Sequence, residues 1–273
     1  MPLTAASEPT VVLLHALSLH ATMWQAQERA LRAAGHPVIA LDQRGFGTAP
    51  LGTAPPCLDV VADDVARALD RLGSHRAVLV GSSMGGYAAM AFLRRFPDRV
   101  AGLALLSARA TADSPGTAAE RMRFAELVQD ERSRQAVLER ATPLLVGATT
   151  RQHRPHVLSR VLADARAADP AALAWAQRAI AARTDSTVLL RATRVPAVVI
   201  AGAEDELVTA QEAQAVADAL PQSTLVTVPG AGHLAPLEAP EAVTGALLDL
   251  LGDIAAPRPV RAARRTETGA PSC

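Results

Sequence analysis

The chain has 273 residues, of which 49% are hydrophobic and 20% are charged. These proportions are typical of a soluble globular protein with a sizeable core. The 27 basic and 27 acidic residues give a formal net charge of zero, which favours neither a nucleic acid nor an anionic membrane as a partner. The 27 basic residues are all arginines, so a Schiff base, a pyridoxal phosphate anchor, a Ser–Lys dyad and a P-loop lysine are excluded.

The cysteines and the first apolar run predict a cytoplasmic protein. Cys57 and Cys273 are the only cysteines, too few for a disulfide framework. The apolar run Val11–Leu14 is shorter than a signal-peptide core or a membrane-spanning helix. A reducing, cytoplasmic setting is therefore expected.

Short apolar runs alternate with helical patterns along the chain. Strands are expected at Thr10–His15, Val38–Asp42, Ala77–Gly81, Gly102–Ser107, Ala197–Gly202 and Thr224–Val228, and such nearly continuous apolar runs are typical of parallel strands covered on both faces. Helices are expected at Thr22–Ala34, Asp59–Leu72, Met84–Phe96, Ala210–Leu220 and Glu238–Leu251. Asp59 is the expected N-cap of its helix, and Gly73 and Gly252 are the expected stops. This order predicts an α/β fold with a doubly wound, mostly parallel sheet that binds ligands beyond the carboxyl ends of its strands.

Residues 109–187 interrupt the alternation with helical patterns alone. They enter and leave at strand ends, which predicts an inserted helical cap or lid over a core formed by residues 1–108 and 188–254. The alternative is that these helices pack on the side of the sheet. The tail, residues 255–273, has no apolar period and is expected to be disordered.

Gly81-Ser82-Ser83-Met84-Gly85 fits the G-x-S-x-G pattern between a predicted strand and a predicted helix. In this pattern the serine occupies a strained turn, and the glycines let neighbouring backbones approach without a Cβ. Ser83 is therefore the candidate nucleophile. The alternative is a glycine-rich turn that only binds phosphate.

The base and acid that a serine nucleophile needs follow later in the chain. His233, in a glycine-rich loop after the last predicted strand, is the candidate base. Asp205 follows the preceding strand, which gives the chain order Ser, Asp, His. Glu204 and Glu206 are rivals for the acid, and a solvated acidic loop is the alternative for all three. His153 and His156 form only a weak metal pattern, so no metal site is predicted.

The chain resembles the α/β-hydrolase fold superfamily from Thr10 to Leu251, in particular its small esterase and enol-lactonase-like members. His15-Ala16-Leu17 resembles the family's His-Gly turn, and residues 42–47 (DQRGFG) resemble its D-x-R-G-x-G loop. The resemblance implies Ser83, Asp205 and His233 as nucleophile, acid and base, an oxyanion hole formed by the backbone N–H groups of Leu17 and Met84, and no cofactor. Ala16 departs from the usual glycine, and its Cβ is expected to crowd the turn that presents the Leu17 N–H.

Fewer residues point to the substrate than to the reaction. Trp24, Met84, Phe124 and Trp175 are candidates for the pocket, although aromatic or Met side chains at helical spacing more often belong to a core. Arg109 lies just past a strand end and could meet a substrate carboxylate, although an arginine at such a boundary is more often solvated.

Three functions are consistent with these residues. The first is a serine hydrolase that cleaves a small carboxylic ester or lactone through an acyl-enzyme. The second is a lyase, cyclase or acyltransferase that uses the same site in a water-excluding pocket. The third is a ligand-binding receptor with a vestigial triad. The oligomeric state is left open.

Overall fold

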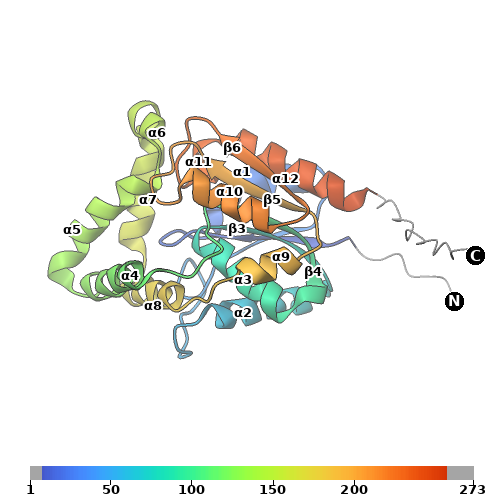
Figure 1. Ribbon diagram of the computed structural model, residues 1–273. Helices are drawn as coiled ribbons and strands as arrows, with labels where there is room; N and C mark the ends of the chain where they lie inside the picture. Colours follow the sequence, from blue (N-terminus) through green and yellow to red (C-terminus); the bar gives the residue numbers. More distant parts are fainter. Residues whose placement is uncertain (1–7, 257–273) are drawn as a thin grey trace, which may run out of the picture.

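The computed structural model describes residues 8–256, and the predicted disordered tail lies almost entirely outside this range. Its centre is one sheet of six parallel strands in the order β2-β1-β3-β4-β5-β6 (Figure 1). The strands are β1 (Thr10–Leu14), β2 (Val38–Leu41), β3 (Ala77–Ser82), β4 (Val100–Leu106), β5 (Ala197–Gly202) and β6 (Ser223–Val228). The predicted doubly wound parallel sheet is confirmed.

Both faces of the central strands are apolar, and successive residues face opposite layers. Val12 and Leu14 of β1 belong to one buried cluster, whereas Val11 and Leu13 belong to the other. This is the period of two expected for a strand. Because both faces are covered, the strands have continuous apolar sequences rather than alternating ones.

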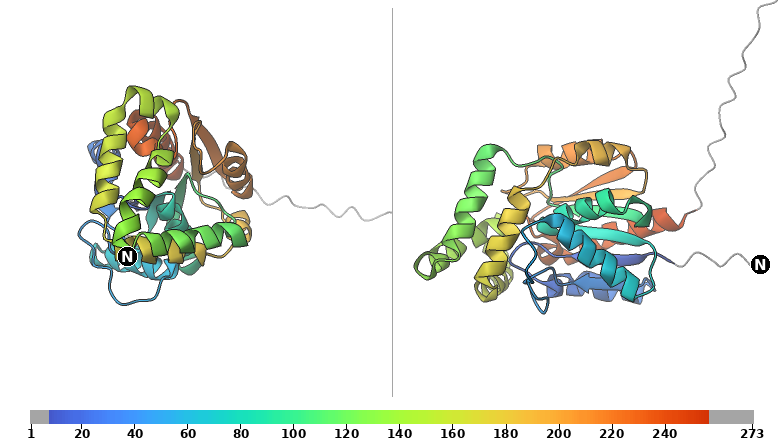
Figure 2. Two further views of the ribbon diagram at one scale, coloured as in Figure 1. Left: turned by 90° about the vertical axis from the view of Figure 1, so that its left-hand side faces the viewer. Right: turned by 90° about the horizontal axis from the view of Figure 1, so that it is seen from below.

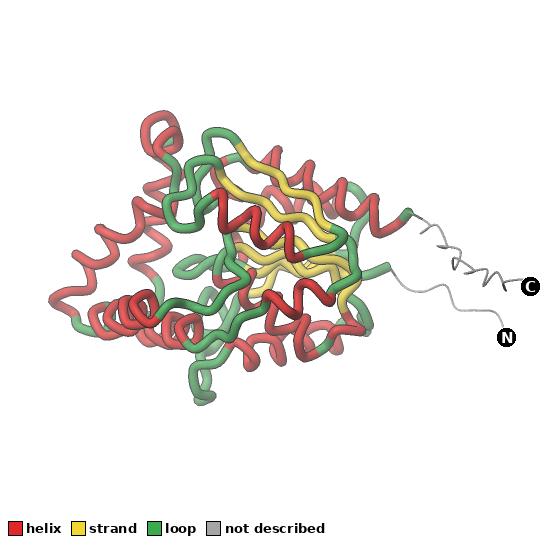
Figure 3. The backbone as a smooth tube through the Cα atoms, in the orientation of Figure 1, coloured by secondary structure: helices red, strands yellow, loops and turns green. Residues whose placement is uncertain are grey.

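Helices cover both faces of the sheet (Figure 3). One face carries α1 (Gln25–Ala33) and α12 (Pro240–Ala255), with the short α11 (Ala235–Glu238) before α12. The other carries α2 (Leu58–Arg71), α3 (Met84–Arg95) and α10 (Ala210–Ala219), with α9 (Thr187–Ala192) beside α10. Single-turn 3-10 helices occur at Ala21–Trp24, Pro97–Arg99 and Thr142–Leu145.

The segment between β4 and β5 is helical, as its sequence predicts. It contains α4 (Pro115–Leu127), α5 (Glu131–Ala141), α6 (Ala148–His153), α7 (Pro155–Ala167) and α8 (Pro170–Ala181). These helices gather at one end of the molecule, opposite the end where the described chain begins and finishes (Figures 1 and 2). Because every strand runs in the same direction, that end is the carboxyl edge of the sheet. Packing on the side of the sheet is therefore not the arrangement observed.

Two predicted helix ends are wrong. Cys57, not Asp59, is the N-cap of α2, and Asp59 lies in the first turn. Helix α12 continues through Gly252 to Ala255, because a glycine inside a helix costs only about 1 kcal/mol and the apolar face of α12 continues beyond it. Gly73 does follow α2 with a φ of 65°, the left-handed geometry that favours glycine after a helix. Within residues 8–256, no helix has the length and apolar character needed to span a bilayer.

Candidate active site

Ser83 occupies a strained turn between β3 and α3. Its φ and ψ angles are 52° and −112°, a conformation that costs a non-glycine residue free energy unless the surroundings enforce it. A hydrogen bond of 2.8 Å from the Ser83 N–H to the Leu106 carbonyl ties the turn to the adjacent strand. The turn therefore presents the half-buried Ser83 side chain at the carboxyl edge of the sheet.

The two glycines of the motif are required by close backbone packing. A Cβ at Gly81 would overlap the Gly85 carbonyl, and a Cβ at Gly85 would overlap the Leu14 carbonyl of β1. The chain therefore uses glycine at both positions because helix α3 starts directly against two strands.

Two unpaired N–H groups lie beside this turn. Met84 is the first residue of α3, and Leu17 follows β1, the strand next to β3. Neither N–H has a hydrogen-bond acceptor among residues 8–256. At the start of a helix, free N–H groups and the helix dipole favour negative charge.

Asp205 and His233 form a buried pair. The His233 Nδ1 lies 3.0 Å from both carboxylate oxygens of Asp205, and the two side chains are 4% and 1% exposed. Burial raises the pKa of Asp205, but the hydrogen bonds from His233 and from the N–H groups of Val208 and Leu207 outweigh it and hold the pKa below its usual value. The carboxylate therefore stays charged and orients the imidazole.

The rival carboxylates have other partners. Glu204 accepts hydrogen bonds from the N–H and the hydroxyl of Thr149 at the start of α6, which hold its pKa below the usual value. Glu206 forms an ion pair with Arg151 at 2.8 Å. Among residues 8–256, the carboxylate that forms a hydrogen bond with His233 is that of Asp205.

Glu238, which sequence reasoning missed, holds the histidine loop. Its carboxylate is 2% exposed and accepts hydrogen bonds from Gly232 (3.0 Å) and Leu234 (3.1 Å), the residues on either side of His233. It also accepts one from Gly147 (2.8 Å), at the base of the helical segment. In the sequence, Glu238 is only the first residue of the predicted helix Glu238–Leu251, and no motif marks it as a partner of the histidine loop.

Ser83 and His233 line one cavity of about 490 Å³. One part of its wall comes from loops at the carboxyl ends of the strands, including Leu17 and Val208. The other part comes from the helical segment, including Phe124, Leu138 and Leu173. The wall is mostly apolar, a composition typical of small-molecule sites.

Comparisons with known proteins identify the family of the chain. Residues 9–240 match the alpha/beta hydrolase fold family. The chain belongs to this family. Its structure is similar to a thermophilic esterase from Thermogutta terrifontis, solved with malate bound, with a TM-score of 0.87 and 37% identity over 92% of each chain.

Two curated proteins that are similar to this chain are named for different hydrolytic activities. The "Putative carbamate hydrolase RutD" of Variovorax paradoxus is 33% identical over 90% of this chain and 93% of its own length. The 3-oxoadipate enol-lactonase 2 of Acinetobacter baylyi is 27% identical over 89% of this chain and 88% of its own. The esterase and enol-lactonase likeness predicted from the sequence is confirmed.

The structure places some of the predicted pocket residues of this hydrolase in the cavity wall and others outside it. Phe124 and Arg109 line the cavity. Trp24 is fully buried in the core under α1, so its prediction as a pocket residue is wrong. Trp175 also lies outside the cavity wall, since its indole N–H donates to the Ala54 carbonyl at 2.8 Å. Met84 packs in the core on the other face, where only its backbone is available to the turn.

Ala16 occupies the turn of the hydrolase with backbone angles that any residue can adopt. In residues 8–256, the left-handed non-glycine residues are Ser18, Ser83 and Ser107, so position 16 does not need the conformational freedom of glycine. The Ala16 N–H meets the Met23 sulfur at 3.3 Å, and its carbonyl accepts from His15 Nδ1 at 2.8 Å.

Within the described range, no group of three His, Cys, Asp or Glu side chains is arranged to hold a metal.

Proposed function

We propose that this hydrolase cleaves a small carboxylic ester or lactone through an acyl-enzyme on Ser83. The observation that carries the proposal is the strained Ser83 in the same cavity as His233, whose Nδ1 is bound by Asp205. This combination supplies a nucleophile, a base and a group that fixes the tautomer of the base.

The proposed reaction has two halves. Ser83 Oγ attacks the substrate carbonyl while His233 Nε2 accepts the hydroxyl proton, and the oxyanion binds the Met84 and Leu17 N–H groups. The C–O bond to the leaving alcohol then breaks, and His233 returns the proton to that oxygen. Water, deprotonated by His233, attacks the acyl-enzyme, the C–O bond to Ser83 breaks, and His233 returns the proton to Ser83 Oγ as the acid is released. Each free N–H that contacts the oxyanion is worth about 10²–10³ in rate.

Carbamate hydrolysis is a second candidate, because the Variovorax paradoxus relative is named for it. The same nucleophile would attack the carbamate carbonyl, and a nitrogen or oxygen leaving group would take the proton from His233. Esters, lactones and carbamates with the same acyl size, assayed in parallel, distinguish the two candidates by their kcat/KM values.

The test of the proposal is covalent labelling. Treatment with a fluorophosphonate, followed by intact mass measurement and peptide mapping, should give one adduct on Ser83. The Ser83→Ala variant should give none and lose ester turnover by at least 10³-fold with its melting temperature retained. His233→Ala should label much more slowly. Unchanged turnover in Ser83→Ala would remove Ser83 from the proposed role.

A further inference from the structure

Two arginines interrupt the mostly apolar wall of the cavity. Arg121 projects from α4, and Arg109 lies just after β4. A guanidinium always carries a positive charge in proteins, and removing it from water is costly unless a negative group faces it. The partners of each arginine therefore decide which guanidinium charge is not balanced by a carboxylate.

Within the described residues, the one carboxylate that pairs with Arg121 is shared with a second arginine. Asp113 lies 2.6 Å from Arg121 Nε and 2.7 Å from Arg183 Nη2. The Asp113 side chain is 1% exposed, while Arg183 and Arg121 are 5% and 19% exposed. Burial raises the pKa of Asp113, but the hydrogen bonds and charges of the two arginines outweigh it and keep the pKa below its usual value. One ionised carboxylate thus faces two guanidinium groups, and the cluster carries a net charge of +1.

Arg183 is buried away from the cavity, so the unbalanced positive charge of the cluster faces the cavity through Arg121. Arg183 donates to the carbonyls of Ile180 and Thr111 and lies 4.2 Å from the centre of the Tyr87 ring. Arg121 donates from Nη1 to Gln177 at 3.0 Å. Its Nη2 has no acceptor in the part of the chain that the structure describes. A rigid guanidinium with a free donor therefore lines the cavity.

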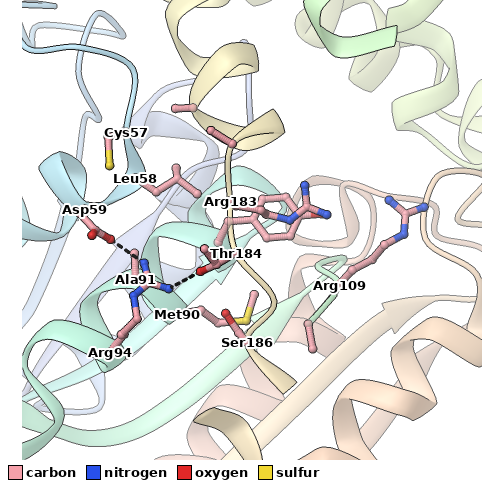
Figure 4. Close-up of a pocket in the computed structure, with 14 residues that line it drawn as sticks. Cys57, Leu58, Asp59, Met90, Ala91, Arg94, Arg109, Arg183, Thr184 and Ser186 are labelled. Carbon is pink, nitrogen blue, oxygen red and sulfur yellow. Dashed lines mark hydrogen bonds and ion pairs between the residues drawn. The ribbon is translucent and has the colours of Figure 1, made fainter. Parts of the chain in front are cut away.

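The other arginines near the site are neutralised one to one. Glu212 lies 2.5 Å from Arg109. Beyond Tyr87 and Arg109, a smaller pocket of about 110 Å³ contains Arg94, which contacts Asp59 at 2.5 Å and Thr184 at 3.1 Å (Figure 4). Glu120, beside Arg121 in the chain, also lines the cavity, but it is exposed and its charge is screened by solvent.

We propose that Arg121 binds a carboxylate group of the substrate, at the end remote from the carbonyl that Ser83 attacks. The preferred ester or lactone is then an anionic one. This inference rests on the proposed function. Its physical basis is the charge-assisted, planar pairing of guanidinium with carboxylate, which is stronger in an apolar surrounding than in water.

The test compares charged and neutral esters of equal length. The p-nitrophenyl monoesters of succinic, glutaric and adipic acid are compared with those of butyric, valeric and hexanoic acid. For at least one chain length, wild-type kcat/KM should be tenfold or more higher for the charged ester. Arg121→Gln should reduce this preference, measured as the ratio of kcat/KM for the charged and the neutral ester, at least tenfold.

Two further variants separate local binding from long-range charge. Arg123 is exposed on the same helix and does not line the cavity, so Arg123→Gln should keep the wild-type preference. Arg121→Lys keeps the charge but not the planar fork and should retain part of the preference. Arg121→Gln is expected to fold, because Asp113 keeps Arg183 as a counterion.

Failure of this inference can be distinguished from failure of the proposed function. Hydrolysis of neutral esters with no preference for charged ones, or an unchanged preference in Arg121→Gln, would overturn the carboxylate site and leave the esterase proposal intact. If no ester is hydrolysed, titration of the Ser83→Ala protein with glutarate decides. Saturable binding that Arg121→Gln weakens tenfold supports the site, and absence of binding overturns it.

Discussion

His15 shows how burial fixes the chemistry of a single side chain. It is the residue directly after β1, and its Nε2 accepts the Gln43 N–H at 2.9 Å while Nδ1 donates to the Ala16 carbonyl. The accepting role of Nε2 requires the neutral imidazole, because an imidazolium carries a proton on both ring nitrogens. Burial lowers the pKa of His15 from 6.5 to about 4, although the hydrogen bond to Ala16 partly opposes the shift. His15 therefore holds the turn that presents Leu17 and is not a rival base to His233.

The buried His15 should make the hydrolase less stable in mild acid. The unfolded chain binds a proton at His15 near pH 6.5, whereas the folded protein does so only near pH 4. This contribution to stability is therefore fully present above pH 6.5 and is lost as the pH falls towards 4, by about 3 kcal/mol. Urea unfolding of the wild type at pH 8, 6 and 5 should show a decrease to which His15 contributes.

Substitution of His15 isolates this contribution from that of the acidic residues. His15→Gln should lower stability at pH 8 but show a smaller decrease between pH 8 and 5 than the wild type. His75→Gln, at an exposed position, should keep the wild-type decrease. Equal pH dependence in His15→Gln and wild type would show that His15 does not titrate as its burial requires.

At the scale of elements, the helical segment is joined to the histidine loop by backbone contact. A Cβ at Gly232 would overlap the backbone nitrogen of Gly147, just before α6. The Leu234 N–H donates to the Leu145 carbonyl at 3.1 Å. Glu238 accepts hydrogen bonds from both sides of this junction. The base of the helical segment and the position of His233 are therefore mechanically linked.

Gly232→Ala should disturb both elements at once. The added methyl group has no space against the Gly147 backbone, so we expect a loss of at least about 2 kcal/mol in stability. Ester turnover should fall at least tenfold, because His233 follows directly. Urea unfolding and steady-state kinetics measure the two effects.

The matched control is Gly245→Ala. Gly245 lies within α12, where a Cβ would meet no atom within 4 Å. This variant should gain about 0.5–1 kcal/mol from helix propensity and keep full turnover. If Gly232→Ala behaved like Gly245→Ala, the histidine loop would not depend on this contact.

At the scale of the whole molecule, the helical segment shares the hydrophobic cores of the sheet. Leu173 and Ile180 of α8 belong to the cluster under α2 and α3, and Val157 and Val161 of α7 belong to the cluster on the other face. A segment buried against both clusters cannot open fully without exposing apolar surface of the core. The sheet and the helical segment should therefore unfold together.

The two tryptophans test this expectation, because each reports on one part. Trp24 lies in the sheet core and Trp175 in α8, and the chain contains no other tryptophan. Trp175→Phe and Trp24→Phe each leave one fluorescent reporter. Urea midpoints from fluorescence should agree with the midpoint from circular dichroism within each variant. A lower midpoint for Trp175 fluorescence than for circular dichroism in the Trp24→Phe variant would show that the helical segment unfolds first.

The sequence by itself determined the features that depend on neighbouring residues. Continuous apolar runs define the six parallel strands, and the glycines around Ser83 define the turn, because strand burial and backbone crowding act within a few residues. Ser83, Asp205 and His233 each follow a predicted strand. The sequence places them at one edge of the sheet, because the carboxyl ends of parallel strands share an edge.

Only the tertiary structure decided the features that join distant segments. Phe124 and Trp24 are both aromatic residues near helices, yet one lines the cavity and the other fills the core. Asp113 meets Arg121 eight positions later but Arg183 seventy positions later, and Glu238 meets Gly147 ninety-one positions earlier. Such partners depend on how helices pack, and no local pattern in the sequence encodes that packing.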